Sequence, residues 1–179
     1  MQRSQLEHVI RASGAITGAS DFVVIGSQAI LGQFPHAPDE LLASIEADVF
    51  SLRNPDDSDL IDGCIGEGSP FHQTFGYYAH GVAMETASLP AGWQERLVPI
   101  ENPNTGGGRG LCLEVHDLAA SKLAAGREKD VAFLRALLRH RLAQPDTIRL
   151  RLAQMELDPQ QIEVCQQRLK RLTRENEHP

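Results

Sequence analysis

The chain has 179 residues, of which 41% are hydrophobic and 23% are charged, and its net charge is −7. This length suits a single domain or a domain with a small appendage. The acidic balance argues against broad, sequence-independent binding of a nucleic-acid backbone, although it leaves room for a local basic cleft. The N-terminus has no apolar signal-peptide core, no stretch reaches the roughly 18 apolar residues of a membrane span, and the three cysteines match no disulfide pattern. We therefore expect a soluble, cytoplasmic protein with reduced thiols.

The start of the chain predicts a helix, a strand and a second helix. Apolar residues at helical spacing predict the first helix over residues 4–13, and Gly14 is expected to end it. Residues 22–25 form a short β-branched run that is typical of a buried strand. The chain then turns at Gly26-Ser27, where a helix is expected to begin with Ser27 near its N-cap.

The rest of the chain predicts further strands and then helices alone. The expected strands cover residues 44–52, a segment near 81–86, the end of LVPIE and residues 111–115. The expected helices begin at Asn54-Pro55 and then cover residues 117–126, 127–141, 146–155 and 158–175. This order indicates an α/β or α+β fold. We expect an α/β core over residues 1–116 and a helical C-terminal region over 117–179 that packs on it.

Two acidic residues project together from the strand predicted over residues 44–52. Glu46 and Asp48 stand two positions apart, and side chains at this spacing point to the same face of a strand. Mg²⁺ prefers oxygen ligands and usually takes one or two carboxylates, with phosphates and water completing its shell. The Gly26-Ser27 turn lets backbone and hydroxyl approach phosphates closely. The solvent face of an edge strand would explain the acids alone, but the two motifs in this order favour a metal-phosphate site.

Two segments of the sequence together resemble a known superfamily. VVIGSQAI and SIEADVF are similar to the glycine-serine and paired-acid motif of the nucleotidyltransferase (polymerase-beta-like) superfamily. HDLAASKLAAGREKDVAFLRALL resembles the Lys…Arg-x-Lys-Asp signature of a bacterial group of nucleotidyltransferase-like proteins, which is related to the abortive-infection toxins of type IV toxin–antitoxin systems. The resemblance covers roughly residues 5–142. It implies a mixed sheet flanked by helices, with Mg²⁺ or Mn²⁺ as cofactor and an NTP as substrate.

The resemblance also assigns roles to residues of the first two motifs. Gly26 and Ser27 would hold the nucleotide phosphates, and Glu46 and Asp48 would act in catalysis by binding the metal ion. The chain departs from the family at one point, because the superfamily usually has Asp where this sequence has Glu46. Glutamate is one methylene longer, about 1.5 Å of extra bond, and Mg²⁺ is exacting about geometry.

Charged residues cluster around Gly126 in the segment SKLAAGREKD. Lys122 and Arg127 are suited to nucleotide phosphates, Arg bidentately and Lys as a point charge. The resemblance places Lys122 on the triphosphate and makes Asp130 a further catalytic acid, as ligand or base. The alternatives are that Asp130 stabilises the start of the following helix and that Arg127 is solvated. Asp117 is predicted to be the N-cap of the helix that carries Lys122.

The remaining polar and aromatic residues give weaker signals. The spacings of the histidines and the cysteine considered as zinc ligands match no known zinc-site pattern; these residues are His36, His72, His80, Cys112 and His116. Two acids on predicted strands are each candidates for a third carboxylate: Glu85 and Glu114. The aromatic residues between 71 and 93 are predicted to line the core or a pocket, with stacking on a base as the alternative.

These signals together predict a Mg²⁺-dependent nucleotidyltransferase that moves a nucleotidyl group from an NTP to an RNA, protein or small-molecule hydroxyl. A toxin-like role with an antitoxin partner stays open, and no membrane partner is expected. Two alternatives keep the same fold. One is a catalytically silent nucleotide-binding module, which Glu46 at an Asp position motivates. The other is a toxin–antitoxin interaction module.

Overall fold

The chain folds around a mixed sheet of five strands in the order β3-β2-β1-β5-β4, and the computed structural model describes residues 1–177. The strands are β1 (Asp21–Ile25), β2 (Glu46–Ser51), β3 (Tyr78–Gly81), β4 (Val98–Ile100) and β5 (Arg109–Cys112). β1 runs antiparallel to β2 and parallel to β5. β2 is parallel to β3, and β4 is antiparallel to β5. The open mixed sheet with its many helices is an α+β fold, which confirms the predicted fold class.

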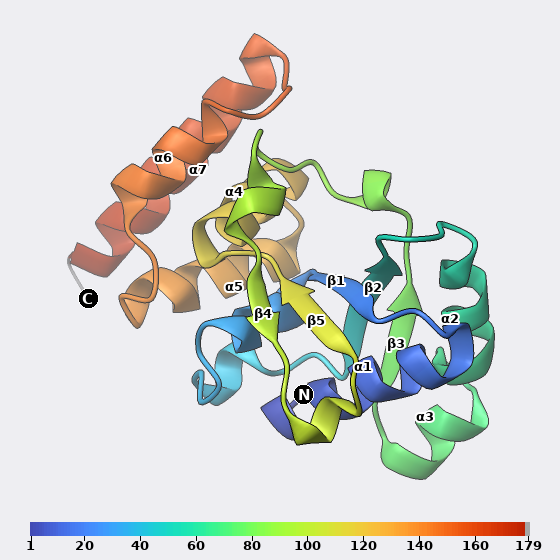
Figure 1. Ribbon diagram of the computed structural model, residues 1–179. Helices are drawn as coiled ribbons and strands as arrows, with labels where there is room; N and C mark the ends of the chain where they lie inside the picture. Colours follow the sequence, from blue (N-terminus) through green and yellow to red (C-terminus); the bar gives the residue numbers. More distant parts are fainter. Residues whose placement is uncertain (178–179) are drawn as a thin grey trace.

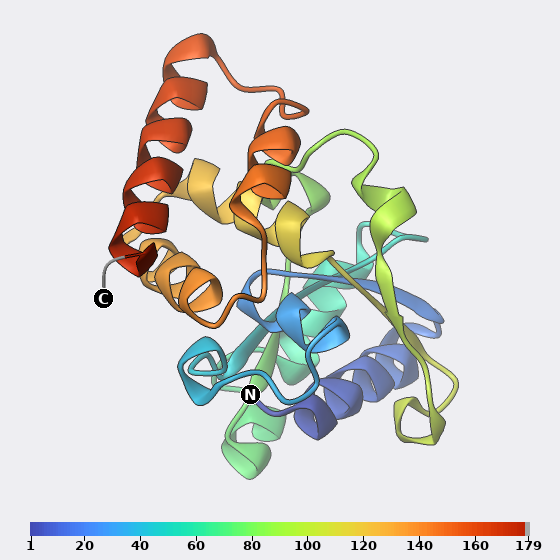
Figure 2. The same cartoon turned by 90° about the vertical axis from the view of Figure 1, so that its left-hand side faces the viewer.

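Helices cover both faces of this sheet (Figures 1 and 2). They are α1 (Arg3–Thr17), α2 (Asp57–Ile65), α3 (Pro70–Phe75), α4 (Val115–Ala125), α5 (Glu128–Arg139), α6 (Pro145–Leu152) and α7 (Pro159–Glu177). α6 and α7 lie side by side and pack against α4 and α5 (Figure 2). Among residues 1–177, no helix is both long and apolar enough to cross a membrane.

Strand β1 lies at the centre of the sheet, and its two faces contact different elements. Four of its five residues are buried. Phe22 lies against Gly14 of α1 on one face. Ile25 lies on the other face, opposite Asp48 of β2 in the antiparallel register. Because antiparallel partners point to the same side of a sheet, the acids of β2 project away from α1.

Near the N-terminus one predicted boundary is wrong, and one predicted helix is of a different type. α1 continues past Gly14 and ends at Gly18, which has the left-handed conformation (φ 70°) that many helix C-termini require. The helix expected after β1 is a 3₁₀ helix, Ser27–Gly32, whose N-cap is Gly26 and which has no side-chain cap. The helix therefore begins at Ser27 as predicted, with the backbone of Gly26 at the N-cap position.

Two predicted strands also lie earlier in the chain than expected. The strand predicted near 81–86 is β3, because pairing with β2 begins at Tyr78, and residues 84–86 form a 3₁₀ turn instead. The strand predicted over 111–115 is β5, which ends at Cys112. Glu114 then caps α4 by accepting hydrogen bonds from two backbone N–H groups of its first turn, so the end of LCLEV begins a helix.

Candidate functional site

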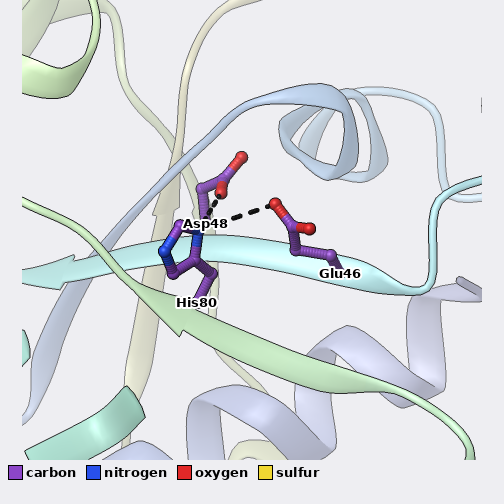
Figure 3. A group of neighbouring side chains, drawn as sticks. All are labelled: Glu46, Asp48 and His80. Carbon is purple, nitrogen blue, oxygen red and sulfur yellow. Dashed lines mark hydrogen bonds and ion pairs between the residues drawn. The ribbon is translucent and has the colours of Figure 1, made fainter. Parts of the chain in front are cut away.

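The two acids of the sequence motif lie side by side on β2 (Figure 3). Both are half-buried. The parallel register puts Tyr78 of β3 opposite Glu46 and His80 opposite Asp48. The Tyr78 hydroxyl donates a hydrogen bond to Glu46 Oε2 at 3.0 Å. His80 Nδ1 lies 3.3 Å from Asp48 Oδ1 and 3.6 Å from Glu46 Oε1. Two strands thus bring two carboxylates and one imidazole to the same place.

The ionisation of the two carboxylates is linked, because like charges at this separation oppose each other. Burial, followed by the neighbouring Glu46, raises the pKa of Asp48 to about 6. Burial also opposes the ionisation of Glu46, but hydrogen bonds with Asp48 and Tyr78 outweigh it, and the pKa of Glu46 is lowered. Burial and the bond to Glu46 raise the pKa of Tyr78 to about 12, so its hydroxyl remains a donor. The acid pair therefore carries negative charge that a bound cation would relieve.

The Gly26-Ser27 turn follows β1 and lies directly against the acid pair. Gly26 has φ 66° and ψ −166°, a region that essentially only glycine occupies. A Cβ atom at this position would lie 2.1 Å from Asp48 Oδ2, so glycine is also needed to make room for the carboxylate. Ser27 is half-buried, and its Oγ accepts a hydrogen bond from Lys122 Nζ at 3.0 Å.

Lys122 comes from α4 and reaches Ser27 in the turn beside the acids. Its Nζ donates to Asp130 Oδ1 at 2.9 Å and lies 4.6 Å from the centre of the Phe133 ring. Arg127 Nε donates to the other Asp130 oxygen at 2.6 Å. Gly126 ends α4, as predicted, and its left-handed conformation turns the chain so that α5 presents Asp130 to Lys122.

Burial and pairing act in opposite directions on this ion pair. Burial lowers the pKa of Lys122, and the hydrogen bond to Asp130 only partly offsets the shift. Burial would raise the pKa of Asp130, but the hydrogen bonds from Arg127 and Lys122 outweigh it and lower that pKa. Asp130 is fully buried, whereas the Arg127 side chain is 62% exposed. Arg127 is thus accessible to a ligand from solvent, whereas Lys122 is enclosed.

Two clefts meet at the acid pair. The first has a volume of about 520 Å³, and its lining contains six of the seven residues that the sequence nominated: Gly26, Ser27, Glu46, Asp48, Lys122 and Arg127. The second, of about 420 Å³, shares these residues except Ser27 and adds His80 and Ser121. Asp130 lines neither cleft, because it lies behind Lys122. The structure therefore brings the nominated residues together, with Asp130 set back from the acid pair.

Sequence reasoning missed Tyr78 and His80 as members of this site. Tyr78 and His80 are two positions apart, as Glu46 and Asp48 are, and this spacing could have indicated that both side chains lie on one face of a strand. The signal was lost because the strand was expected several residues later. His80 was considered only with the other histidines for zinc. Among the histidines and the cysteine considered for zinc, His80 alone lies in a group of possible metal ligands within the described part of the chain.

Three other predictions about acidic residues are wrong. Asp117 is not the N-cap of α4, since Glu114 has that role. Asp117 is fully buried and pairs with Arg96 at 2.8 Å and with Arg151 at 3.0 Å. Glu114 does not lie on a strand, and neither does Glu85, which is exposed in a 3₁₀ turn. Neither belongs to the ligand group at the acid pair, whose third member is a histidine.

The site agrees with the family to which the chain is matched. A family model described as "Nucleotidyltransferase of unknown function" (DUF6036) matches residues 4–142, and the chain belongs to this family. The resemblance to nucleotidyltransferases that the motifs predicted is thereby confirmed. The match contains every site residue named above and ends before α6. No curated protein and no solved structure matches the chain.

Proposed function

We propose that this member of a nucleotidyltransferase family transfers a nucleotidyl group from an NTP to an acceptor hydroxyl with the help of a divalent cation. One observation carries the proposal. Two carboxylates from β2, the glycine-serine turn after β1 and a buried lysine from α4 converge on one cleft. In-line displacement at phosphorus needs groups that hold a cation and groups that hold the phosphates, and this cleft offers both.

The acid pair fits a divalent cation on chemical grounds. Glu46 and Asp48 offer hard oxygen ligands, and their mutual repulsion favours a bound positive charge. The ion would neutralise charge on the phosphates during the displacement. Mg²⁺ or Mn²⁺ meets this need, as the sequence predicted. The two acids orient the ion, and Gly26 leaves space for Asp48 to do so.

We assign phosphate binding to the Gly26-Ser27 turn and to the basic residues. Ser27 offers its hydroxyl, and Lys122 offers a point charge that its buried ion pair holds in place. Arg127 is exposed and lines both clefts, so it is available for bidentate contacts to phosphate oxygens. We assign Asp130 to the positioning of Lys122 rather than to the metal, because it is fully buried and set back behind the lysine.

The two clefts suit the two substrates. The attacking and leaving oxygens lie on opposite sides of phosphorus during in-line displacement, and the clefts meet at the acid pair. We assign the NTP to the cleft that contains Ser27 and the acceptor to the cleft that contains His80. The wall of the acceptor cleft includes Leu157 and Gln161, which lie beyond the family match. The helical region over residues 117–179 would therefore contribute to the choice among RNA, protein and small-molecule acceptors.

Isothermal titration with each NTP tests the proposal. We expect binding to depend on Mg²⁺ or Mn²⁺ and to weaken at least tenfold in Asp48→Ala, or about 1.4 kcal/mol, because the variant loses a ligand of the ion that contacts the phosphates. Asp59→Ala, which removes an exposed carboxylate from α2, is the matched control and should bind like the wild type. Equal NTP binding without metal and without Asp48 would refute the enzyme and favour the silent binding module.

Labelled NTPs identify the acceptor class. The wild type is incubated with each labelled NTP, the metal ion and total cellular RNA, and Asp48→Ala serves as the inactive control. Label that appears in RNA or in the protein itself distinguishes two of the acceptor classes. Absence of label from both, together with metal-dependent NTP binding, directs the search to small hydroxyl compounds. The toxin-like role and an antitoxin partner stay predictions, which co-purification from the native host addresses.

A further inference from the structure

We propose that His80 is a third protein ligand of the cation and that it shifts the preference of the site from Mg²⁺ toward Mn²⁺. The inference rests on the proposed function, because Glu46 and Asp48 supply the other two ligands. The fold brings His80 to the acids through the parallel pairing of β2 and β3, in which it stands opposite Asp48. The side chain lines the acceptor cleft and is half exposed, so it can reach an ion that enters from solvent.

The three side chains are spaced as ligands of a single ion (Figure 3). His80 Nδ1 lies 3.3 Å from Asp48 Oδ1 and 3.6 Å from Glu46 Oε1. One ligand atom from each of the three residues lies within 4.8 Å of the others. Ligands that bind one ion at about 2.1 Å lie about 3 Å apart when adjacent in an octahedron. Small side-chain movements therefore bring all three atoms onto one ion.

The other oxygen of each carboxylate lies next to a different residue. Tyr78 binds Glu46 Oε2, and the space left by the missing side chain of Gly26 accommodates Asp48 Oδ2. Glu46 Oε1 and Asp48 Oδ1 are the oxygens that remain on the side of His80. The bond from Tyr78 also fixes the longer side chain that Glu46 introduces where the superfamily usually has aspartate. Glu46, Asp48 and His80 thus form one consistent ligand set, in which Tyr78 supports Glu46.

Ligand chemistry sets the expected preference. Mg²⁺ favours oxygen ligands and keeps several waters, whereas imidazole nitrogen binds first-row transition ions more strongly. Mn²⁺ accepts carboxylate oxygens and, as a transition ion, also gains from a nitrogen ligand. The competing view is that protonated His80 merely forms ion pairs with the acids. In that case the cation would displace the imidazole and bind through the carboxylates alone.

Electron paramagnetic resonance on Mn²⁺ bound to the protein separates these views, since echo envelope modulation detects a directly bound ¹⁴N nucleus. We expect nitrogen modulation in the wild type and its loss in His80→Ala. Mn²⁺ affinity should fall about tenfold or more in this variant, because even residues that only support a metal ligand contribute that much. Mg²⁺ affinity should change less than about threefold. His36→Ala, at an exposed histidine in the loop after the Ser27–Gly32 helix, should match the wild type in every measurement.

The outcomes distinguish failure of this inference from failure of the proposed function. Absence of a nitrogen signal in the wild type, or an unchanged preference for Mn²⁺ over Mg²⁺ in His80→Ala, overturns the inference. If Asp48→Ala still abolishes binding in that case, the proposed function stands. Failure of the wild type to bind either ion, or wild-type affinity in Asp48→Ala, overturns both. Because His80 is half exposed, His80→Ala should fold, and thermal unfolding of each variant verifies this.

Discussion

The candidate site has an acidic half on β2 and β3 and a basic half on α4 and α5, and the two are built in opposite ways. The acidic half consists of Glu46, Asp48 and His80, and the basic half of Lys122, Arg127 and Asp130. In the basic half every charge meets an opposite charge at hydrogen-bond distance, and the central pair is buried. In the acidic half two like charges lie close together beside a half-exposed imidazole.

The difference indicates which half contributes to the fold and which is set up for a ligand. A buried ion pair is satisfied only in one geometry, so its partners hold each other in place before any ligand arrives. Crowded carboxylates are destabilised by burial and by each other, and a bound cation reverses this. We therefore expect substitutions in the basic half to weaken the fold. Substitutions in the acidic half should leave the metal-free fold unchanged or strengthen it while removing metal binding.

Lys122→Met has the largest expected effect and tests the structural role of the basic half. It leaves the Asp130 carboxylate buried with only Arg127 as a partner. Removal of one member of a buried pair typically costs about 3–5 kcal/mol in the free energy of unfolding. The cost for Lys122→Met should lie near the lower end of this range, because Arg127 still pairs with Asp130. Urea unfolding measures it.

The double variant Lys122→Met/Asp130→Asn is the matched control for that experiment. Asparagine removes the uncompensated charge, so the double variant should regain about half or more of the lost stability. NTP binding should stay weak in both variants, because the phosphate contact is absent from each. A loss below about 1 kcal/mol in Lys122→Met would contradict the view that this pair holds the fold together.

Gly26→Ala tests the junction between the turn and the acids and should have the next largest effect. Alanine at φ 66° and ψ −166° is strained by about 1–3 kcal/mol, and its Cβ would displace the Asp48 carboxylate. Both unfolding stability and Mn²⁺ affinity should therefore fall. Gly63→Ala, at an open position within α2, is the control and should stabilise the fold by about 0.5–1 kcal/mol. Wild-type metal affinity in Gly26→Ala would refute the role of this glycine.

The pH dependence of stability should differ between wild type and Asp48→Asn in metal-free buffer. The pKa of Asp48 is raised from 3.8 to about 6 in the folded protein. Between these values the folded state holds a proton that the unfolded state has lost, so wild-type stability falls as pH rises from about 4 to about 6. Asp48→Asn has no carboxyl to titrate here. Its free energy of unfolding should therefore rise relative to that of the wild type by about 1–2 kcal/mol between pH 4 and pH 6. Unfolding curves at several pH values measure the difference, and parallel profiles would contradict it.

Local patterns were sufficient to predict the parts of the site that lie on single elements. The alternation around Glu46 and Asp48 identified the strand and its acid face, and Gly126 identified the end of the helix that carries Lys122. A glycine followed by serine after a buried strand identified the turn. Each of these signals depends on residues within a few positions of one another, which is the range in which backbone preference and periodicity act.

The features that could not be predicted depend on pairing between distant segments. His80 joins the acids only because β3 pairs with β2, more than 30 positions earlier in the chain, and no local pattern specifies that register. The same holds for the start of α4. Whether Glu114 or Asp117 caps α4 depends on where β5 stops pairing with β1. The ion pairs of Asp117 with Arg96 and Arg151 also join distant segments, so no local pattern predicts them.

Tyr78→Phe has the smallest expected effect and sharpens the comparison within the acidic half. It removes the hydrogen bond to Glu46 Oε2 and keeps the ring. One such bond to a charged acceptor is worth about 1.5–3 kcal/mol when fully desolvated, and less at this half-buried carboxylate. We expect Mn²⁺ affinity to fall about fivefold, or about 1 kcal/mol.

Tyr77→Phe provides the control, because it removes the neighbouring hydroxyl, which lies 2.7 Å from His8 Nδ1 on the α1 side of the sheet. It should lower stability without changing metal affinity. If Tyr78→Phe binds Mn²⁺ like the wild type, Glu46 needs no support from β3. The additional methylene at the aspartate position is then tolerated by the site without a compensating contact.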